Sequence, residues 1–321
     1  MSERPPEAVL WDCLRGGLVT RALALAADLQ IPERLRARPR AVEELARESG
    51  ADPDVLHRLL RALASDGVFV EREPGVFANT DTSELLLGPG WRDFAHLFGG
   101  VWLQAIAAVD ASGEASFPRL QGTDFWSWLA DHPAERASFD RAMAQGGENR
   151  LQRLGRVDWA SVETVVDVGG GTGSLLAELF GLQPHLRGIV FDLPETARDE
   201  SVFDARMRFV EGSFFDSVPP GDAYLLSTIL HDWDDEGAAA ILRTIHRGAP
   251  PGARLVLLEA VIEPGNEADG AKWLDLLMLT LFAGRERDEA QWRALLESAG
   301  WEPVAVEDGL IQARVSGSPA P

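Results

Sequence analysis

The sequence predicts a two-part α/β protein, in which a mainly helical first half precedes a parallel sheet covered by helices. Apolar residues recur at helical spacing from Pro6 to about Arg153, with few runs typical of strands. After Arg153, short apolar runs alternate with helical segments. A glycine-rich stretch, VVDVGGGTGSL at residues 165–175, joins one such run to a helix. These observations predict a helical domain followed by a domain of strands and crossover helices.

The first half contains two amphipathic segments, LVTRALALAADLQI and DVLHRLLRALASDG. Residues 41–80 read as helix, turn, helix and hairpin, an order typical of a winged helix. A winged helix can read DNA or serve as a structural, dimer-forming unit. Residues 41–87 contain four arginines against ten acidic residues, whereas a phosphate-binding surface would carry the opposite charge. We therefore favour the dimer-forming use and keep DNA binding as the alternative.

The second half contains five apolar runs of strand length, each followed by a turn or a helix signal. The runs are TVVDV, GIVF, RMRFV, DAYLLS and ARLVLLEAV. Their alternation with helices predicts a parallel sheet with helices on its faces. We expect a helical domain at residues 1–153, a sheet domain at 154–316 and a disordered tail at 317–321, within the final SGSPAP stretch.

The composition limits the kinds of partner. A formal net charge of −21 over 321 residues opposes binding to nucleic acid or to an anionic membrane, and favours a small-molecule partner. No segment resembles a signal peptide or a membrane span, so we expect a cytoplasmic protein. Cys13 is the only cysteine, which excludes an internal disulfide and a cysteine-rich zinc site. We expect no metal site.

The glycine-rich stretch has the features of a nucleotide-type site. A strand ends in Asp167, and the glycines that follow allow a tight turn and the close approach of a ligand before a helix begins at about Ser174. The dinucleotide pattern G-x-G-x-x-G, started at Gly169, finds Gly171 but meets Ser174 in place of the third glycine. This departure weakens NAD as the ligand without excluding it.

The next strand, in GIVFDLPE, ends in Asp192. A carboxylate at this position can accept hydrogen bonds from both ribose hydroxyls of an adenosine-containing cofactor. NAD and S-adenosylmethionine share that ribose, so the residues alone leave both open. The structural alternatives are a helix N-cap for Asp192 and a surface carboxylate for Asp167.

His231 stands in STILHDWDD, between an apolar run and a group of carboxylates. If DAYLLSTIL is a strand, this histidine lies at its carboxyl end, where open α/β sheets form their ligand crevice. The alternative is a polar residue that is simply satisfied at a strand end. Asp232 or Asp234 can cap the helix that DDEGAAAILRTIHR begins, so these carboxylates need no part in chemistry.

Six stretches, taken in order, carry a resemblance to a known family. They are VVDVGGGTGSL, FDLPE, FVEGSFFDSVP, YLLSTILHDWDD, LLEAVI and FAGRERDEAQW. They resemble the small-molecule O-methyltransferases that use S-adenosylmethionine, the group of plant caffeic acid O-methyltransferase and the bacterial polyketide O-methyltransferases. The resemblance implies a Rossmann-like sheet of seven strands with an antiparallel last strand, GLIQARV, and a winged-helix dimerisation domain that forms a swapped homodimer.

The resemblance also implies a cofactor site. Its positions here are Asp167, Gly169, Gly171, Asp192, Leu193, Ser213, Phe214 and Ser227. The two glycines would bring the backbone close to S-adenosylmethionine, Asp192 would hold its ribose, and Ser213 and Phe214 would lie near its adenine. A common form of the family motif has aspartate where this chain has Ser213, and plant members often have lysine at Ser227. These departures affect individual hydrogen bonds to the cofactor and not the fold.

The resemblance makes His231 the general base, with Glu259 and Glu286 as its acidic partners. A phenolic hydroxyl has a pKa of about 10, so its anion is scarce at neutral pH. A positioned imidazole can remove that proton as the methyl group moves, and a histidine pKa near neutral suits the task. A neighbouring carboxylate can fix the tautomer of the imidazole and stabilise its charged form.

The expected substrate is an aromatic or polyketide-like small molecule with a hydroxyl acceptor. The residues expected to line its pocket are Phe125, Trp128, Phe139, Met143, Asp232, Met278 and Phe282. Such aromatic and methionine residues can equally be plain core. Two other functions stay open: non-methylating use of the same cofactor, in hydroxylation, decarboxylation or rearrangement, and a DNA-binding regulator.

Overall fold

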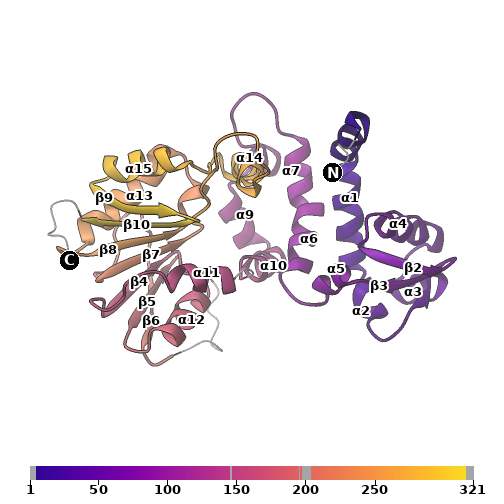
Figure 1. Cartoon of the computed structure of the whole chain (residues 1–321), viewed down its shortest axis with the longest axis horizontal. Coiled ribbons are helices and arrows are strands. Elements are labelled where there is room, and N and C mark those ends of the chain that lie inside the picture. The colour runs from indigo at the N-terminus through magenta and orange to yellow at the C-terminus, as the bar shows by residue number, and fades with distance from the viewer. Residues whose placement is uncertain (1–4, 145–146, 195, 197–203, 316–321) are drawn as a thin grey trace. The chain divides into compact units, whose positions relative to one another are not determined.

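The computed structural model describes residues 5–144, 147–194, 196 and 204–315 (Figure 1). The chain forms two compact units. The first unit comprises Met1–Ala108 and Ser127–Gln145, and the second comprises Val109–Trp126 and Gly146–Pro321. Residues 109–126 belong to the second unit and residues 127–145 to the first, so the division differs from the single boundary expected at residue 153. The expected tail at 317–321 lies outside the described residues.

The first unit is mainly helical, as expected. Its helices are α1 (Pro6–Asp28), α2 (Ile31–Leu35), α3 (Val42–Ser49), α4 (Pro53–Ser65), α5 (Asp81–Glu84), η1 (Leu85–Leu87), α6 (Trp91–Gly99), α7 (Val101–Ala107) and α10 (Pro133–Met143); α9 (Phe125–Asp131) crosses the division between units. Strands β1 (Arg40–Ala41), β3 (Val76–Asn79) and β2 (Phe69–Glu73) form an antiparallel sheet in that order. Helices α3 and α4 followed by the β2–β3 hairpin form the helix-turn-helix and wing that the sequence predicts.

Helix α4 illustrates why this part of the sequence folds as predicted. Asp52 caps the helix by accepting a hydrogen bond from the backbone N–H of Val55, and Pro53 occupies the first turn. Its buried residues Leu56, Leu60 and Leu63 recur every three or four positions and so face one side. That side joins the hydrophobic core of the first unit.

The second unit is built on a seven-stranded sheet. Its strands are β4 (Thr164–Val168), β5 (Arg187–Asp192), β6 (Met207–Glu211), β7 (Ala223–Ser227), β8 (Arg254–Leu258), β9 (Trp301–Glu307) and β10 (Leu310–Val315). Their spatial order is β6-β5-β4-β7-β8-β10-β9, with β6, β5, β4, β7 and β8 parallel and β10 antiparallel to both of its neighbours. The seven-stranded sheet and the antiparallel GLIQARV strand are therefore confirmed.

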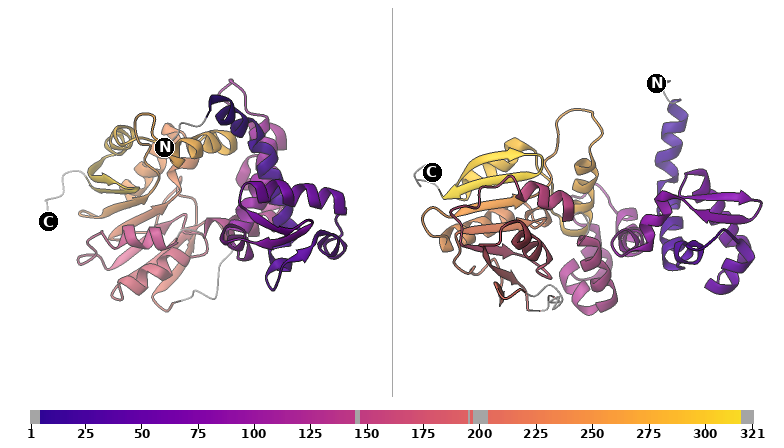
Figure 2. Two further views of the ribbon diagram at one scale, coloured as in Figure 1. Left: turned by 45° about the vertical axis from the view of Figure 1, so that its right-hand side comes forward. Right: turned by 60° about the horizontal axis from the view of Figure 1, so that its bottom comes forward.

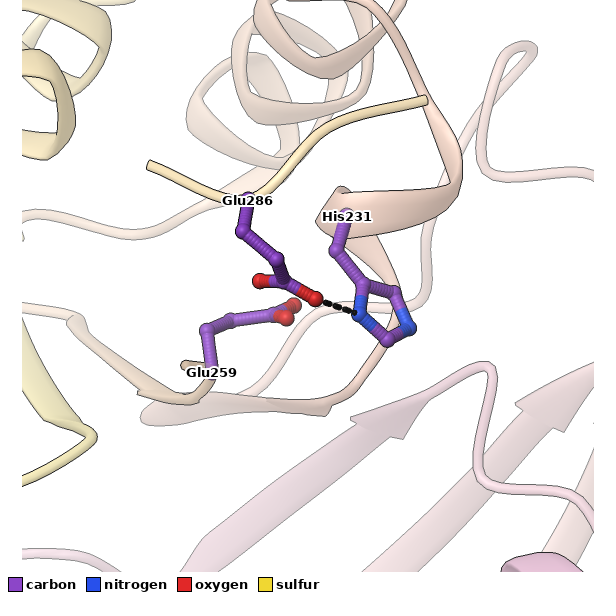
Figure 3. A group of neighbouring side chains, drawn as sticks. All are labelled: His231, Glu259 and Glu286. Atoms are coloured by element: carbon purple, nitrogen blue, oxygen red, sulfur yellow. Dashed lines mark hydrogen bonds and ion pairs between the residues drawn. The ribbon is translucent and has the colours of Figure 1, made fainter. Parts of the chain in front are cut away.

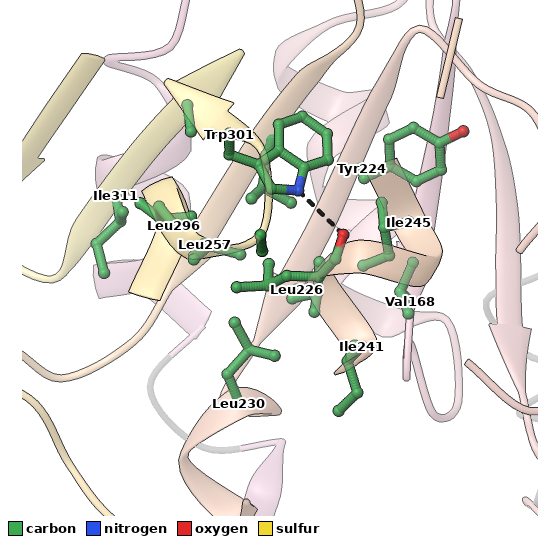
Figure 4. Packing of buried hydrophobic residues seen from close by; sticks show 14 of the residues in the cluster. Val168, Tyr224, Leu226, Leu230, Ile241, Ile245, Leu257, Leu296, Trp301 and Ile311 are labelled. Atoms are coloured by element: carbon green, nitrogen blue, oxygen red, sulfur yellow. Dashed lines mark hydrogen bonds between the residues drawn. The ribbon is translucent and has the colours of Figure 1, made fainter. Parts of the chain in front are cut away.

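Helices cover both faces of this sheet (Figure 2). Among the described residues, the helices that lie wholly in this unit are α8 (Ser116–Gln121), α11 (Gly147–Leu154), α12 (Ser174–Leu182), η3 (Leu230–Asp232), α13 (Asp235–Gly248), α14 (Gly270–Phe282) and α15 (Glu289–Ser298). Helices α13 and α15 pack on one face and α11 and α12 on the other, each in its own hydrophobic cluster. Successive strand residues alternate between the clusters, as Val165 and Val166 do. In the first cluster the buried Trp301 donates a hydrogen bond from Nε1 to the Leu242 carbonyl at 3.0 Å (Figure 4).

The strand order places a crevice at one edge of the sheet. The chain runs outward from β4 through β5 to β6, and then returns to β7 on the other side of β4. In open α/β sheets ligands bind at such a reversal, outside the carboxyl ends of the strands. The segments after β4, β5, β7 and β8 therefore converge on one site. Within the part of the chain that the structure describes, no helix has both the length and the apolar character needed to span a membrane.

Candidate active site

The loop after β4 contains two glycines with different physical roles. Gly169 has φ of 71°, and a Cβ atom there would lie 2.5 Å from Cδ1 of Ile229. Gly171 has φ of 57°, and a Cβ atom there would meet nothing within 4 Å. Gly169 is thus required for close packing against the turn after β7, whereas open space beside Gly171 leaves its backbone accessible to a ligand.

Asp192 connects the end of β5 to this loop. Its Oδ2 accepts a hydrogen bond from the Gly171 N–H at 2.8 Å, and its Oδ1 accepts from the Leu193 N–H and the Thr196 hydroxyl, both at 2.7 Å. A small cavity is lined by these four residues together with parts of β5 and β6. The helix that Asp192 would cap in its alternative role would begin in LPETA, residues 193–197, of which residues 195 and 197 lie outside the described residues.

Asp167, next to last in β4, and Ser227, last in the neighbouring β7, carry buried polar atoms. Asp167 is 2% exposed, so the surface-carboxylate alternative for it is wrong. Burial first, and the negative charge of Asp192 second, raise the pKa of Asp167 to about 7. Its Oδ2 and the Ser227 Oγ have no hydrogen-bond partner within the described residues.

These features fit an adenosine-type cofactor with further polar groups. Buried polar atoms are nearly always hydrogen-bonded in native proteins, so the Asp167 and Ser227 atoms indicate a partner from outside the chain. The ribose and amino-acid portions of S-adenosylmethionine carry such hydroxyl and ammonium donors. Around the crevice, Leu193 is 45% exposed, the Ser213 Oγ accepts from the Phe215 N–H, and Phe214 packs edge-on against Trp233. The contact of these three residues with the cofactor stays a prediction.

The strand before His231 is shorter than predicted. Strand β7 ends at Ser227, and Thr228 adopts φ of 54°, a left-handed conformation that is rare for a β-branched residue. The Thr228 N–H donates to the Leu258 carbonyl at the end of β8, and the following residues form the 3-10 helix η3. The left-handed residue ends the strand and turns the chain, so that His231 projects from η3 rather than from the strand itself.

The structure brings together the histidine and the two glutamates that the resemblance assigns (Figure 3). Nδ1 of His231 lies 2.6 Å from Oε1 of Glu286, and its Nε2 lies 3.4 Å from Oδ1 of Asp232. One possible ligand atom from each of His231, Glu259 and Glu286 lies within 4.8 Å of the others. All four residues are less than 9% exposed. The site is a buried imidazole surrounded by carboxylates.

Glu259 follows β8 directly and supports the turn that carries His231. Its Oε1 accepts hydrogen bonds from the backbone N–H groups of Ile229 and Leu230, at 2.9 and 2.8 Å. Its Oε2, like Oε2 of Glu286, is buried without a partner within the described residues. A histidine and two glutamates could hold a metal ion, but the histidine Nδ1 and the inner Glu259 oxygen are already engaged. The arrangement favours proton chemistry over metal binding.

The charges around His231 move its pKa away from neutral. Burial disfavours the imidazolium, but this is outweighed by the attraction of Asp232, the hydrogen bond to Glu286 and the charge of Glu259, which together raise the pKa of His231 to about 10. Burial also raises the pKa of Asp232 to about 7 and raises that of Glu259. The pKa of His231 thus lies above the ordinary histidine value, because three buried carboxylates face one imidazole.

The carboxylates that follow Asp232 have structural roles. Asp234 is the N-cap of α13 and accepts a hydrogen bond from the Gly237 N–H at 2.8 Å. Of the two capping candidates, Asp234 is therefore the cap, and Asp232 remains in the buried site. The side chain of Asp232 is 8% exposed and makes its closest charged contact with His231.

The loop 283–288, which carries Glu286, is held against the turn of His231. A Cβ atom on Gly284 would lie 2.2 Å from the His231 carbonyl oxygen, so no larger residue fits there. The Arg285 N–H donates to that same carbonyl at 2.9 Å. Asp275 of α14 accepts from the Glu286 N–H at 2.8 Å. The close approach of these segments brings the glutamate within reach of the imidazole.

The residues expected to line the substrate pocket fall in both compact units. In the second unit Phe125 is fully buried, with its ring 4.8 Å from that of Phe282, while Met278 is 5% exposed. In the first unit Trp128 stacks on His132 at 4.0 Å, and Phe139 and Met143 are half-buried on α10. Phe125 thus packs against Phe282, another of the expected lining residues. Pocket membership of all seven residues stays a prediction.

Sequence reasoning missed Arg287 and Asp275, which hold the segments of the site in place. Arg287 is fully buried and hydrogen-bonds to the turn of His231. Its position next to Glu286 in GRERD was the available signal, because a basic residue beside an assigned site residue can act on the same segment. Asp275 offered a weaker signal, since an aspartate in the apolar stretch KWLDLLML needs a buried or capping partner.

Two family descriptions match this chain. The model of an O-methyltransferase dimerisation domain matches residues 11–89, and the model of an O-methyltransferase domain matches residues 102–302. Among curated proteins, phenazine O-methyltransferase PhzM of Lysobacter antibioticus is 35% identical over 97% of this chain and 96% of its own length. A mitomycin biosynthesis 6-O-methyltransferase of Streptomyces lavendulae is 36% identical over 92% of this chain and 88% of its own.

Solved structures of similar proteins also match nearly the full length of this chain. The crystal structure of LaPhzM matches with a TM-score of 0.90 and 35% identity, and covers 97% of this chain and 100% of that one. NcsB1, an O-methyltransferase from neocarzinostatin biosynthesis, matches with a TM-score of 0.80 and 32% identity over 92% of this chain and 95% of that one. That structure is a complex with S-adenosyl-L-homocysteine and 1,4-dihydroxy-2-naphthoic acid.

Proposed function

The chain belongs to the S-adenosylmethionine-dependent O-methyltransferases, and from this premise we propose that His231 is the general base of methyl transfer to a hydroxyl of an aromatic or polyketide-like small molecule. S-adenosylmethionine supplies a methyl group attached to a positively charged sulfur. The observation that carries the proposal is the 2.6 Å contact between Nδ1 of His231 and Glu286, with both side chains buried beyond the carboxyl ends of the strands.

The proton chemistry follows from this contact. Glu286 accepts a hydrogen bond from Nδ1–H of His231, which leaves Nε2 to accept the proton of the acceptor hydroxyl. A phenol with a pKa of about 10 matches the raised pKa of His231, so the transfer of its proton is nearly balanced in energy. The carboxylates of Glu286 and Glu259 then stabilise the imidazolium that forms.

Asp232 supports a more specific substrate class. Its Oδ1 lies 3.4 Å from Nε2 of His231, so two hydrogen-bond acceptors from the protein stand side by side. A ring with a hydroxyl or amino group next to the methylated hydroxyl could donate to both. The relatives support an aromatic substrate, since their names include a phenazine methyltransferase and NcsB1 was solved with a dihydroxynaphthoic acid. Asp232 is proposed to contact that second substituent.

The function is tested with labelled S-adenosylmethionine and a panel of mono- and ortho-disubstituted phenols. Label in the product ether supports the proposal, and a preference for ortho-disubstituted rings that Asp232→Asn abolishes supports the role of Asp232. Consumption of cofactor without label in product would instead indicate hydroxylation, decarboxylation or rearrangement. A gel shift with duplex DNA at low salt tests the regulator alternative.

The cofactor site is proposed to depend on Asp192. Asp192→Ala is expected to weaken S-adenosylmethionine binding by about 1 to 3 kcal/mol, because charge-assisted hydrogen bonds to the ribose are lost. Titration calorimetry measures this, with Asp110→Ala, which changes an exposed aspartate of the same unit, as the control. Unchanged affinity in a folded Asp192→Ala protein would refute the ribose assignment.

The dimerisation domain is proposed to form a homodimer through α1. This helix exposes a row of large apolar side chains, namely Val9, Leu10, Trp11, Leu14 and Leu18, at 47 to 76% exposure. Exposed large apolar side chains gathered on one helix are typical of an interaction surface. Light scattering should give about twice 34.9 kDa at micromolar concentration. Leu14→Arg should shift the mass towards the monomer, and a wild-type monomer at every concentration would contradict the proposal.

A further inference from the structure

Arg287 is a fully buried arginine in the loop that carries Glu286. A buried guanidinium is costly unless its donors are paired, so its partners indicate why it is there. It shares Asp235 with its neighbour Arg285, whose side chain is 45% exposed. The two arginines of this loop thus have one carboxylate in common but differ in burial.

The guanidinium spans the turn that carries His231. Nη1 of Arg287 donates to the Leu230 carbonyl at 3.2 Å, and Nη2 donates to the Trp233 carbonyl at 3.0 Å. These two carbonyls lie on either side of His231 and Asp232 in the chain. Nε donates to Asp235 Oδ1 at 2.9 Å, at the first residue of α13. One planar group therefore fixes both ends of the turn.

The backbone of Arg287 connects the same loop to the segment after β8. Val261 and Arg287 form a parallel bridge, and the Ile262 N–H donates to the Arg287 carbonyl at 3.0 Å. Trp292 lies 5.1 Å from the guanidinium and donates to the Ala260 carbonyl at 3.0 Å. Glu259 is the residue before Ala260, so Arg287 joins all three segments of the site.

We propose that Arg287 is a positioning residue for methyl transfer, which holds the turn at residues 230–233 so that the imidazole of His231 meets the carboxylate of Glu286. This inference rests on the proposed function of His231. Site geometry must be held within about 0.5 Å, and a displacement of about 1 Å can cost a hundredfold in rate. Lysine cannot replace the fork, because its single ammonium group cannot reach three diverging acceptors in one plane.

The first test is Arg287→Lys in the full-length protein, measured for turnover and for its proton NMR spectrum. We expect kcat to fall roughly ten- to a hundredfold while the KM for S-adenosylmethionine stays unchanged. The Nδ1–H proton of a short histidine–carboxylate hydrogen bond resonates far downfield, and this signal should weaken or disappear. The pH dependence of kcat/KM should shift as well. The matched control is Arg285→Lys, which changes the exposed neighbour and should preserve all three readouts.

The NMR readout separates this inference from the proposed function, because it needs no turnover. Should Arg287→Lys retain the downfield proton and the pH profile and lose only thermal stability, Arg287 is structural and the inference is wrong. Should that variant fail to fold, Asp235→Ala decides, since it removes the acceptor of the Nε hydrogen bond at a residue whose side chain is 60% exposed. A milder loss of the same signal supports the inference, and an unchanged spectrum and rate overturn it.

Discussion

Two histidines of this chain lie between carboxylates, yet they differ in burial and in how completely they are paired. In the first unit His96 is 2.7 Å from Asp28 through Nδ1 and 3.2 Å from Glu135 through Nε2, and its side chain is 35% exposed. The side chain of His231 is 10% exposed, with one hydrogen bond at 2.6 Å and one contact at 3.4 Å. Both have raised pKa values, to about 9 for His96 and about 10 for His231.

The difference in pairing between His96 and His231 shows that a raised pKa alone does not identify a catalytic histidine. At His96 both ring nitrogens have close carboxylate partners from α1 and α10, so the group ties three helices together. At His231 the second nitrogen lacks a close partner, and two buried glutamate oxygens nearby are unpaired within the described residues. Buried groups left unsatisfied are rare in plain structural sites and typical of functional ones.

The largest expected effect is a loss of kcat in the His231→Ala variant that the His96→Ala variant does not show. His231→Ala should lower kcat by roughly 10² to 10⁴, because a positioned general base is lost, while the affinity for S-adenosylmethionine is nearly unchanged. Single-turnover kinetics and calorimetry measure the two quantities. His96→Ala is the matched control and should leave kcat unchanged.

The choice of acceptor sharpens this test. The loss in His231→Ala should be smaller with an electron-poor phenol that is already ionised at neutral pH, since such an acceptor needs no base. Wild-type kcat/KM should rise with pH towards about 10, because the share of neutral imidazole grows. If the His231→Ala variant methylates an ordinary phenol at the wild-type rate, then His231 is not the general base and serves only as part of the turn.

Glu286→Gln should produce the second-largest effect. The amide keeps the size of the side chain but loses the charge, so the hydrogen bond to His231 loses about 1.5 to 3 kcal/mol. In the transition state this corresponds to roughly 10- to 100-fold in kcat. Steady-state kinetics at several pH values measures it. A variant as fast as wild type would mean that orientation of the imidazole does not depend on this carboxylate.

Glu259→Gln is expected to change stability in a pH-dependent way. Burial raises the pKa of Glu259, so the folded state binds its proton more tightly than the unfolded state does. Wild-type stability from this group is therefore greatest below its ordinary pKa and falls as pH rises towards the raised value. Glutamine stays uncharged, so as pH rises above the ordinary glutamate pKa the variant should gain stability relative to wild type in urea unfolding. An identical pH dependence in both proteins would contradict this.

The smallest effect belongs to His96. Its hydrogen bond to Asp28 is the main cause of its raised pKa, so its contribution is fully present below about pH 6.5 and is lost as pH rises through about 9. Partial exposure limits the contribution to less than about 1 kcal/mol. Urea unfolding of wild type and His96→Ala should therefore differ at pH 6 and converge near pH 10. An equal difference at both pH values would show that the contact is not electrostatic.

Local signals in the sequence were sufficient for much of the fold. The start of α12 at Ser174, the winged helix and the position of Glu259 directly after β8 follow from periodicity, glycine placement and strand length. The antiparallel β10 and the meeting of His231 with Glu286 came from the family resemblance, because they depend on contacts between distant segments; His231 and Glu286, for example, are 55 residues apart. No local pattern encodes such a pairing.

Other features depended on three-dimensional packing that the sequence does not reveal. The left-handed Thr228, which shortens β7, is a residue type that ordinarily extends a strand. The burial of Asp232 and the raised pKa of His231 require knowing that three carboxylates face one ring. The close packing of Gly169 against Ile229 depends on a side chain that is distant in the sequence, and the contact of Gly169 with the cofactor stays a prediction.

Thr228 has a consequence for laboratory evolution of this enzyme. A β-branched residue held in a left-handed conformation costs on the order of 1 to 3 kcal/mol, which the surrounding hydrogen bonds must offset. A screen that selects only for heat tolerance should therefore enrich asparagine or glycine at position 228. Those proteins would survive higher temperatures, but the relaxed turn would hold His231 less firmly. A screen that selects for heat tolerance and turnover together should instead retain Thr228 and enrich stabilising substitutions at positions far from the site.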